Sequence, residues 1–139
     1  MICLVLLTSF NQHSYKFDTV YIEKGGLQSI RLTNEGLICK AVNLNLKQSI
    51  RFFKMSKLDH DKLLTIELKV NQFMTLELPD FIDDSKIETS SSPIQLKIIN
   101  QKNFKEITWI DGENKDLDEM IKLVNNLIPE KFRDFYSIK

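Results

Sequence analysis

The sequence is poor in the residues that cross-link a fold, break it or bind metals. Its 139 residues include two cysteines, three prolines, four glycines, two histidines and one tryptophan. Cys3 and Cys39 cannot build a disulfide framework, so stability has to come from a hydrophobic core. Whether they form a single bridge is left open by their spacing. A chain of this length buries about 68% of its unfolded surface, which is enough for one domain over residues 1–139.

An excess of charge of one sign is also absent. Lysine and arginine together number 19, aspartate and glutamate also number 19, and the formal net charge at pH 7 is zero. Proteins that bind nucleic acid usually gather a basic excess on one face, and docking on an anionic membrane also needs basic residues. We therefore expect another protein as the partner, and neither nucleic acid nor a membrane surface. The sequence predicts no particular oligomeric state.

Long apolar runs are missing too. A helix that crosses a bilayer needs about 20 apolar residues, and no stretch of the sequence approaches this length. The run Met1-Ile2-Cys3-Leu4-Val5-Leu6-Leu7 lacks the basic residues that precede a signal sequence. Residues 1–15 are predicted to form an N-terminal arm or a first strand, the alternative being the remnant of a signal or anchor. A cytoplasmic location is expected, with an exported or anchored protein as the alternative.

Motifs that carry chemistry are not found. The sequence has no Gly-x-Ser-x-Gly nucleophile elbow, and Gly25-Gly26 is not followed by the lysine of a phosphate-binding loop. His13 and His60 have no partners at the spacing of zinc ligands. The acidic residues of segment 80–93 lack the alternating ligands and the central glycine of a calcium loop. We therefore predict no enzyme activity, no catalytic residue, no cofactor and no metal site.

The first half of the chain has the pattern of an antiparallel meander. Over residues 16–23 the strand-forming side chains fall into two alternating sets, which is the period of a strand. Gly25-Gly26 ends this pattern and can adopt the positive φ of a turn. Residues 33–36 predict a second turn, because asparagine and glycine both tolerate left-handed backbone. The other strands of the meander are predicted at residues 27–32, 37–42 and 49–54.

Two helices are predicted from apolar residues that recur every three or four positions. The first begins at Ser56, with Asp59 completing a capping box, and fades near Asn71. The second begins at Asp116 and stops before Pro129. Trp109, in the strand that precedes the second helix, is predicted to be a core anchor beneath that helix.

The remaining segments complete the predicted fold. Residues 80–93 read as a flexible acidic surface loop, reached through an apolar loop that contains Phe73. Strands at 94–99 and 105–110 form a hairpin, and residues 132–136 form an apolar tail folded back on the body. The predicted class is α+β, with an antiparallel sheet of about six strands and two helices packed on one face. The order along the chain is a four-strand meander, a helix, a hairpin and a C-terminal helix.

Several segments in succession resemble a known family. They are Gly25-Gly26 after the first strand, Ile-Arg-Leu-Thr-Asn-Glu-Gly at 30–36, Met55-Ser56 at the first helix, Phe-Met-Thr-Leu at 73–76, and Ile-Thr-Trp-Ile-Asp at 107–111. Over residues 16–128 this succession resembles the emfourin-type inhibitors of protealysin- and thermolysin-like metallopeptidases, which belong to a family of small prokaryotic domains. The resemblance implies this fold and a peptidase as the protein partner. It assigns no residue of this chain to peptidase contact.

Two functional hypotheses follow. The first is a non-catalytic protein-binding domain, in its narrower form an inhibitor-like module that offers a rigid segment to a peptidase. Its predicted contact residues are Gly25, Gly26, Leu27 and Gln28, and the acidic loop is a further candidate. The alternative is a structural or assembly subunit of a larger complex, in which the N-terminal arm or the aromatic tail packs on another chain. A small-molecule carrier with a cavity between sheet and helices is a third hypothesis.

Overall fold

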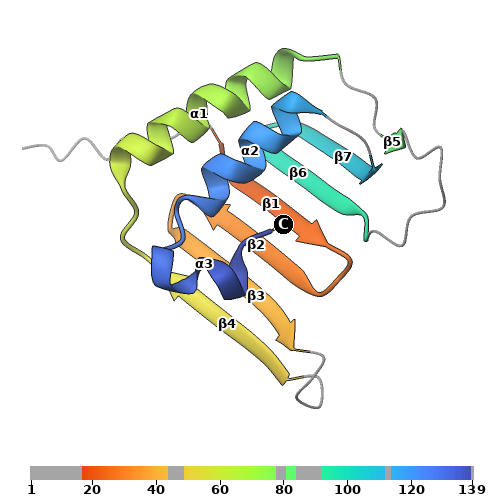
Figure 1. Cartoon of the computed structure of the whole chain (residues 1–139). Helices are drawn as coiled ribbons and strands as arrows, with labels where there is room; N and C mark the ends of the chain where they lie inside the picture. Colours follow the sequence, from red (N-terminus) through yellow and green to blue (C-terminus); the bar gives the residue numbers. More distant parts are fainter. Residues whose placement is uncertain (1–16, 44–48, 78–80, 84–91, 112–113, 139) are drawn as a thin grey trace, which may run out of the picture.

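The computed structural model describes residues 17–43, 49–77, 81–83, 92–111 and 114–138 (Figure 1). Within them, strands and helices follow the order meander, helix, hairpin and two C-terminal helices. The strands are β1 (Thr19–Lys24), β2 (Gln28–Thr33), β3 (Gly36–Asn43), β4 (Ser49–Met55), β5 (Phe81–Asp83), β6 (Ile94–Asn100) and β7 (Asn103–Asp111). The helices are α1 (His60–Thr75), α2 (Lys115–Asn125) and α3 (Glu130–Tyr136).

The strands form one open sheet in the order β4-β3-β2-β1-β6-β7-β5. All neighbours are antiparallel except the three-residue β5, which runs parallel to β7 at one edge. The first four strands are the predicted meander, and the hairpin β6–β7 continues the sheet by pairing β6 with β1. The predicted α+β class with its antiparallel sheet is therefore confirmed, and a third helix is added to the two expected.

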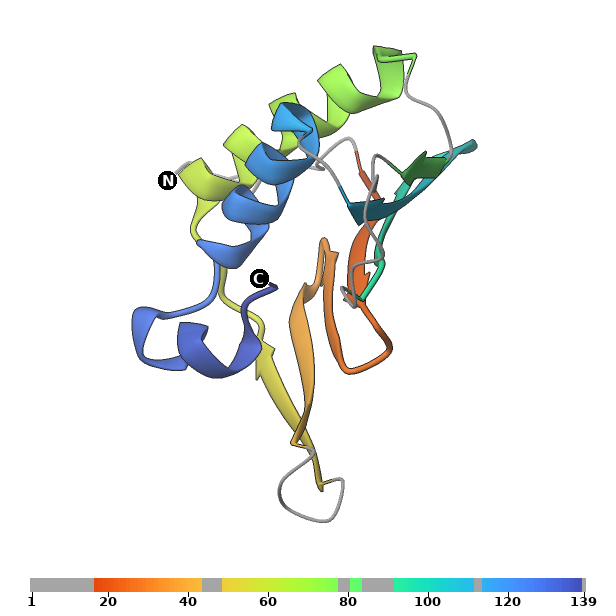
Figure 2. The same ribbon diagram turned by 45° about the vertical axis from the view of Figure 1, so that its right-hand side comes forward.

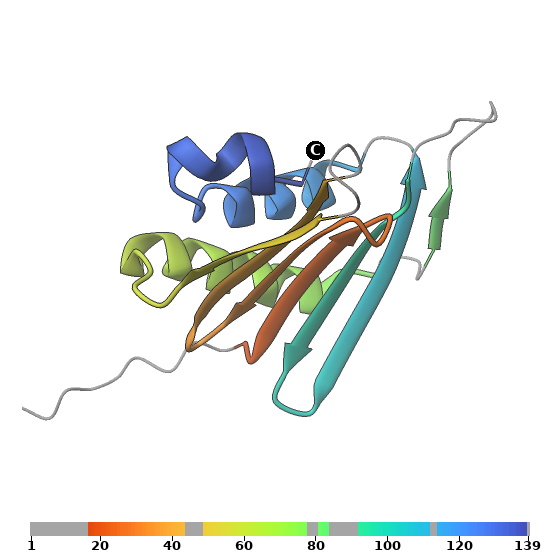
Figure 3. The same ribbon diagram turned by 90° about the horizontal axis from the view of Figure 1, so that it is seen from below.

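The three helices lie on the same side of the sheet, and no helix of the described residues lies on the other side (Figures 2 and 3). Alternate residues of the strands point toward the helices and are buried, as the two-residue period of a strand requires. The core that they form with α1, α2 and α3 includes Val20, Ile22, Ile30, Leu32, Leu37, Cys39, Ile66, Val70, Phe73, Ile98, Ile107, Met120 and Val124. None of the described helices is long and apolar enough to cross a membrane.

The start of α1 differs from the prediction by several residues. Asp59 is the N-cap residue, and its carboxylate accepts hydrogen bonds from the backbone N–H groups of Asp61 and Lys62 at 2.9 and 3.2 Å. Such a side chain satisfies donors that no helical carbonyl can reach. Ser56 therefore lies before the helix, and the predicted capping box is wrong.

The end of α1 also differs from the prediction, because the helix continues past Asn71 to Thr75. Phe73, expected in a loop, is a fully buried helical residue. The ammonium group of Lys105 on β7 donates hydrogen bonds to the backbone carbonyls of Phe73 and Leu76. A lysine at this position satisfies carbonyls at the end of the helix, and its positive charge interacts favourably with the negative end of the helix dipole. The last turn of α1 is thus held by a residue 29 positions away from Leu76.

The C-terminal segment contains two helices where one was expected. Asn114 caps α2 by accepting a hydrogen bond from the N–H of Leu117, so that the helix begins one residue before Asp116. It ends at Asn125 rather than running to Pro129. The predicted aromatic tail is the helix α3. On it, Phe132 and Tyr136 stack against Phe53 of β4 with ring centroids 4.7 and 5.7 Å away.

The predicted acidic loop is partly a strand. Phe81–Asp83 pairs with β7, so the prediction of a loop over this part is wrong. Residues 84–91 and residues 1–15, for which an acidic loop and an N-terminal arm were predicted, lie outside the described residues.

Candidate functional site

The four contact residues predicted from the sequence lie together at the tip of the β1–β2 hairpin. Gly25 and Gly26 both have positive φ, at 59° and 70°, so each adopts the left-handed backbone that glycine accepts most readily. Leu27 is 36% exposed. Gln28 begins β2 and pairs with Lys24 across the hairpin. We call these four residues the 25–28 turn.

Both sides of the 25–28 turn are tied to neighbouring strands. The N–H of Gly25 donates to the carbonyl of Pro93, just before β6, at 3.1 Å. On the other side, the carbonyl of Leu27 accepts from the N–H of Val42 on β3 at 2.9 Å. A Cβ atom on Gly25 would lie 2.7 Å from the Cβ of Ser92, so no larger residue fits there without movement. The turn is therefore a preorganised segment with one exposed apolar side chain.

A second candidate surface, not identified from the sequence, is the sheet face opposite the helices, which we call the outer face. Strand register places one row of side chains straight across it: Lys54, Ile38, Arg31, Tyr21, Lys97 and Glu106. The centre of the row is polar. Lys97 and Glu106 form an ion pair at 3.8 Å, and the hydroxyl of Tyr21 donates a hydrogen bond to Glu23. Burial, followed by the hydrogen bond and charge of Glu23, raises the pKa of Tyr21.

Exposed apolar side chains gather at both ends of the outer face. At the β4 edge, Ile38, Ile50 and Phe52 are 40%, 54% and 66% exposed, and we call these three residues the β4 patch. Phe52 lies opposite Lys40 of β3, so Ile38 is its diagonal neighbour. At the other end, the paired residues Ile99 and Phe104 are also exposed. Contiguous apolar surface of this kind commonly marks a site of protein–protein contact.

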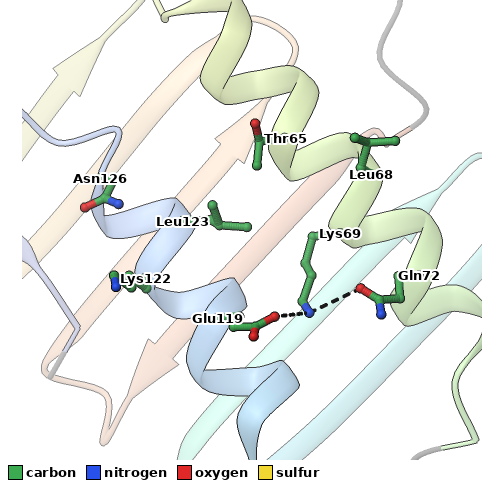
Figure 4. Close-up of a pocket in the computed structure, with 8 residues that line it drawn as sticks. All are labelled: Thr65, Leu68, Lys69, Gln72, Glu119, Lys122, Leu123 and Asn126. Atoms are coloured by element: carbon green, nitrogen blue, oxygen red, sulfur yellow. Dashed lines mark hydrogen bonds and ion pairs between the residues drawn. The ribbon is translucent and has the colours of Figure 1, made fainter.

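A third feature is a groove of about 440 Å³ between α1 and α2 (Figure 4). At its floor the ammonium group of Lys69 lies 3.0 Å from Asp116 and 2.6 Å from Glu119, and it also donates to Gln72. The side chain of Lys69 is only 8% exposed, whereas the two carboxylates remain partly hydrated. Lys69 therefore connects α1 to the first turn of α2, where acidic residues also suit the helix dipole.

The electrostatics of this groove favour a structural role for Lys69. Burial by itself lowers the pKa of the amine, but the hydrogen bonds and charges of Glu119 and Asp116 outweigh it. The net result is a pKa raised above the ordinary 10.5. Lys69 is therefore a protonated donor at neutral pH, which is the opposite of the neutral amine that a nucleophilic or Schiff-base lysine needs.

We expect replacement of Lys69 by methionine to lower the free energy of unfolding by about 1–2 kcal/mol at neutral pH. Because the pKa is raised in the folded protein, the contribution is complete below pH 10.5 and declines as the pH rises through the folded-state value. Urea unfolding of both proteins at neutral pH and at a series of pH values above 10.5 measures this, and the difference between the two stabilities should shrink as the pH rises. Lys122→Met, on the exposed side of the same groove, is the matched control. A deficit that is constant with pH would contradict the ionic origin.

The remaining sequence predictions can be placed as follows. Cys39 is a buried free thiol whose pKa burial raises to about 12, and Cys3 lies outside the described residues. Within the described residues, no group of three His, Cys, Asp or Glu side chains is arranged to hold a metal ion. Trp109, predicted to be a core anchor, packs against the core but is only partly buried, and its indole N–H is buried without a hydrogen-bond partner in the described part of the chain.

Comparisons with protein-family models, with curated proteins and with solved structures find no match for this chain. The resemblance to emfourin-type inhibitors therefore remains a hypothesis from the sequence. Support for a function therefore comes from the geometry of the 25–28 turn and of the outer face.

Proposed function

We propose that this protein is a non-catalytic protein-binding domain. The observation that carries the proposal is the asymmetry of the sheet. One face is closed by three helices, whereas the other exposes Ile38, Ile50, Phe52, Ile99 and Phe104. The hydrophobic effect favours covering such side chains, and exposed apolar residues bordered by polar ones are typical of protein–protein contact sites.

In its narrower form the proposal is that the partner is a thermolysin-type metallopeptidase and that the 25–28 turn is the segment presented to it. An inhibitor needs a segment whose bound conformation exists before binding, because ordering a flexible loop would cost affinity. The hydrogen bonds from Gly25 to Pro93 and from Val42 to Leu27 hold this turn in one conformation before any partner binds. Leu27 supplies the apolar side chain at its tip.

The test is a titration of the whole protein into a thermolysin-like metallopeptidase, followed by residual peptidase activity. We expect stoichiometric inhibition, with the protein itself recovered uncleaved. Leu27→Asp should raise the inhibition constant about tenfold or more, as loss of a central apolar contact does. Leu68→Asp places the same charge on an exposed position of α1, which is 71% exposed, and should leave inhibition unchanged.

The possible outcomes separate the two levels of the proposal. Absence of inhibition at micromolar excess would reject the metallopeptidase as the partner. Inhibition that Leu27→Asp does not weaken would reject the 25–28 turn as the contact segment. Neither result would bear on the outer face, which is tested separately below.

A second candidate function, a subunit of an assembly, is favoured by a specific observation. Strand β4 ends the sheet order, and the β4 patch lies along and beside it. An edge strand with exposed apolar residues is a template for pairing with another chain.

A further inference from the structure

The edge of β4 offers backbone hydrogen-bonding groups as well as apolar side chains. The N–H of Val42 donates to Leu27, which directs the peptide groups of even-numbered β3 residues toward β2. The odd-numbered residues of β3 therefore face β4 and pair there with Phe53 and the other odd-numbered residues of β4. It follows that the peptide groups of Ile50, Phe52 and Lys54 point away from β3.

No strand pairs with that side of β4 within the described residues (Figure 1). The same three residues that turn their peptide groups outward also place their side chains on the outer face. Phe52 and Ile50 are 66% and 54% exposed. Natural sheets usually protect an edge of this kind with short strands, prolines or inward charges. β4 has seven residues and no proline, and its charged side chains are Arg51 on the helix-facing side and Lys54 on the outer face.

The sequence of β4 is complementary to itself in one antiparallel register. When two copies meet around a two-fold axis at Phe52, the two Phe52 residues face each other as a hydrogen-bonded pair. Ile50 of each copy then lies opposite Lys54 of the other, and its side chain can pack on the aliphatic part of that lysine. The central pair and the two flanking pairs each allow two backbone hydrogen bonds.

The helix-facing side of the same register is also favourable. Arg51 of one copy lies opposite Phe53 of the other, in a pair that is not hydrogen-bonded and whose side chains are therefore close. Phe53 already stacks against Phe132 and Tyr136, so an arginine there meets the end of an aromatic cluster and makes a cation–π contact. Because two-fold symmetry repeats the contact, it occurs twice in the dimer.

Neighbouring registers are worse for identifiable reasons. Moving the axis to Arg51 sets the two Arg51 side chains directly opposite each other, and like charges in a cross-strand pair are destabilising. Moving the axis to Phe53 sets Ile50 opposite Ser56 of the other copy. Ser56 lies beyond the end of β4, so Ile50 loses its pairing partner. The chain as a whole carries no net charge, so no long-range repulsion opposes contact between two copies.

We propose that a second copy of this chain binds at the β4 edge, and that the two sheets join through antiparallel pairing of β4 with β4 about Phe52. This partner assignment rests on the proposed protein-binding function and names one partner for it. A two-fold axis perpendicular to the joined sheet keeps the helices of both copies on one side. The two β4 patches then merge into a continuous apolar strip on the outer face.

Sedimentation velocity of the whole protein over a range of concentrations tests the association. We expect twice the 16.3 kDa chain mass at high concentration, with dissociation in the micromolar range because the interface is small. Phe52→Asp should raise the dissociation constant about a hundredfold or more, since it sets two carboxylates face to face at the axis. Phe104→Asp is the matched control, because Phe104 is similarly exposed on the same face at the far end of the sheet. It should leave the dimer intact.

Disulfide trapping tests the register. In a Cys3→Ser background, Phe52→Cys should form a covalent dimer on mild oxidation, because hydrogen-bonded pairs have Cα atoms about 5.5 Å apart. Ile50→Cys should not, because its equivalent in the second copy is four residues away along the strand. The native Cys39 stays inert, since it is buried and its pKa is about 12.

Three outcomes would overturn the proposal. A monomer at all concentrations up to about 1 mM rejects self-association. A dimer that Phe104→Asp dissociates and Phe52→Asp does not would place the interface near β7 and not at β4. Trapping through Ile50→Cys alone would reject the register. Monomeric protein that still inhibits the peptidase would remove the dimer and leave the proposed function in place, so the two failures are distinguishable.

Discussion

Gly36→Ala is expected to lower the free energy of unfolding by about 3 kcal/mol or more, the cost of a strained backbone together with a steric overlap. Gly36 has a φ of 150°, a conformation that side-chain-bearing residues rarely adopt. A Cβ atom at this position would lie 2.4 Å from the carbonyl oxygen of Met55 and 3.1 Å from the Cα of Ser56. Both of those atoms belong to the backbone, so no change of side-chain rotamer relieves the overlap.

Urea unfolding followed by circular dichroism measures this prediction, and Gly26→Ala is its matched control. Gly26 also has a positive φ, of 70°, but the nearest atom to its missing Cβ is a side-chain oxygen of Glu23 at 3.8 Å. The control should therefore cost only the backbone strain, about 1–2 kcal/mol. Equal losses in the two variants would contradict the close approach of the β4 end to Gly36.

Phe73→Ala is expected to cost about 3–5 kcal/mol, as is usual when a large aromatic side chain is removed from a well-packed core. The Phe73 ring is fully buried in the last full turn of α1. Its backbone carbonyl would keep the hydrogen bond from Lys105, so the loss would report packing rather than the end of the helix.

Thermal and urea unfolding of Phe73→Ala are compared with those of Leu68→Ala on the same helix. Leu68 is 71% exposed, and its replacement should change the stability by less than about 0.5 kcal/mol. Similar small effects for both variants would mean that residue 73 lies in a loop, as its sequence neighbourhood first indicated. A large effect for Phe73 alone would support the longer helix.

Strand positions could be predicted from the sequence because their signals are local. The alternation around Val20 and Ile22, and around Leu96 and Ile98, follows the two-residue period of a strand packed on one side. The predicted meander and hairpin correspond to β1–β4 and to β6–β7. The tight turn at Gly25 is equally local, because two adjacent glycines are rarely anything else.

Helix ends could not be predicted as well, because distant residues decide them. Lys105 on β7 holds the carbonyls at the end of α1, and nothing in residues 60–76 signals it. At the other end of α1, the sequence predicts a cap at Ser56 supported by Asp59, whereas in the structure the carboxylate of Asp59 is itself the cap. Serine and aspartate are both common N-cap residues, so the sequence does not say which of the two is used.

The candidate sites divide in the same way. The 25–28 turn could be predicted, because two adjacent glycines indicate a turn whatever tertiary contacts surround them. The β4 patch was not, although Ile50 and Phe52 alternate visibly with Arg51 and Phe53. Both sets contain large apolar residues, so the pattern of β4 does not say which set faces the helices. Only the stacking of Phe53 on α3 decides that Phe52 is left outside.

The sequence by itself therefore determined the class of the fold, the succession of meander, helix, hairpin and second helix, and the balance of charge, because these depend on local periodicity and on composition. It did not determine β5 or α3. Tertiary structure alone decided that β6 pairs with β1, that Lys69 meets Asp116 and Glu119, and that β4 ends the sheet. These features depend on which segments far apart in the chain come together. Burial against such a distant partner is a property that no local pattern records.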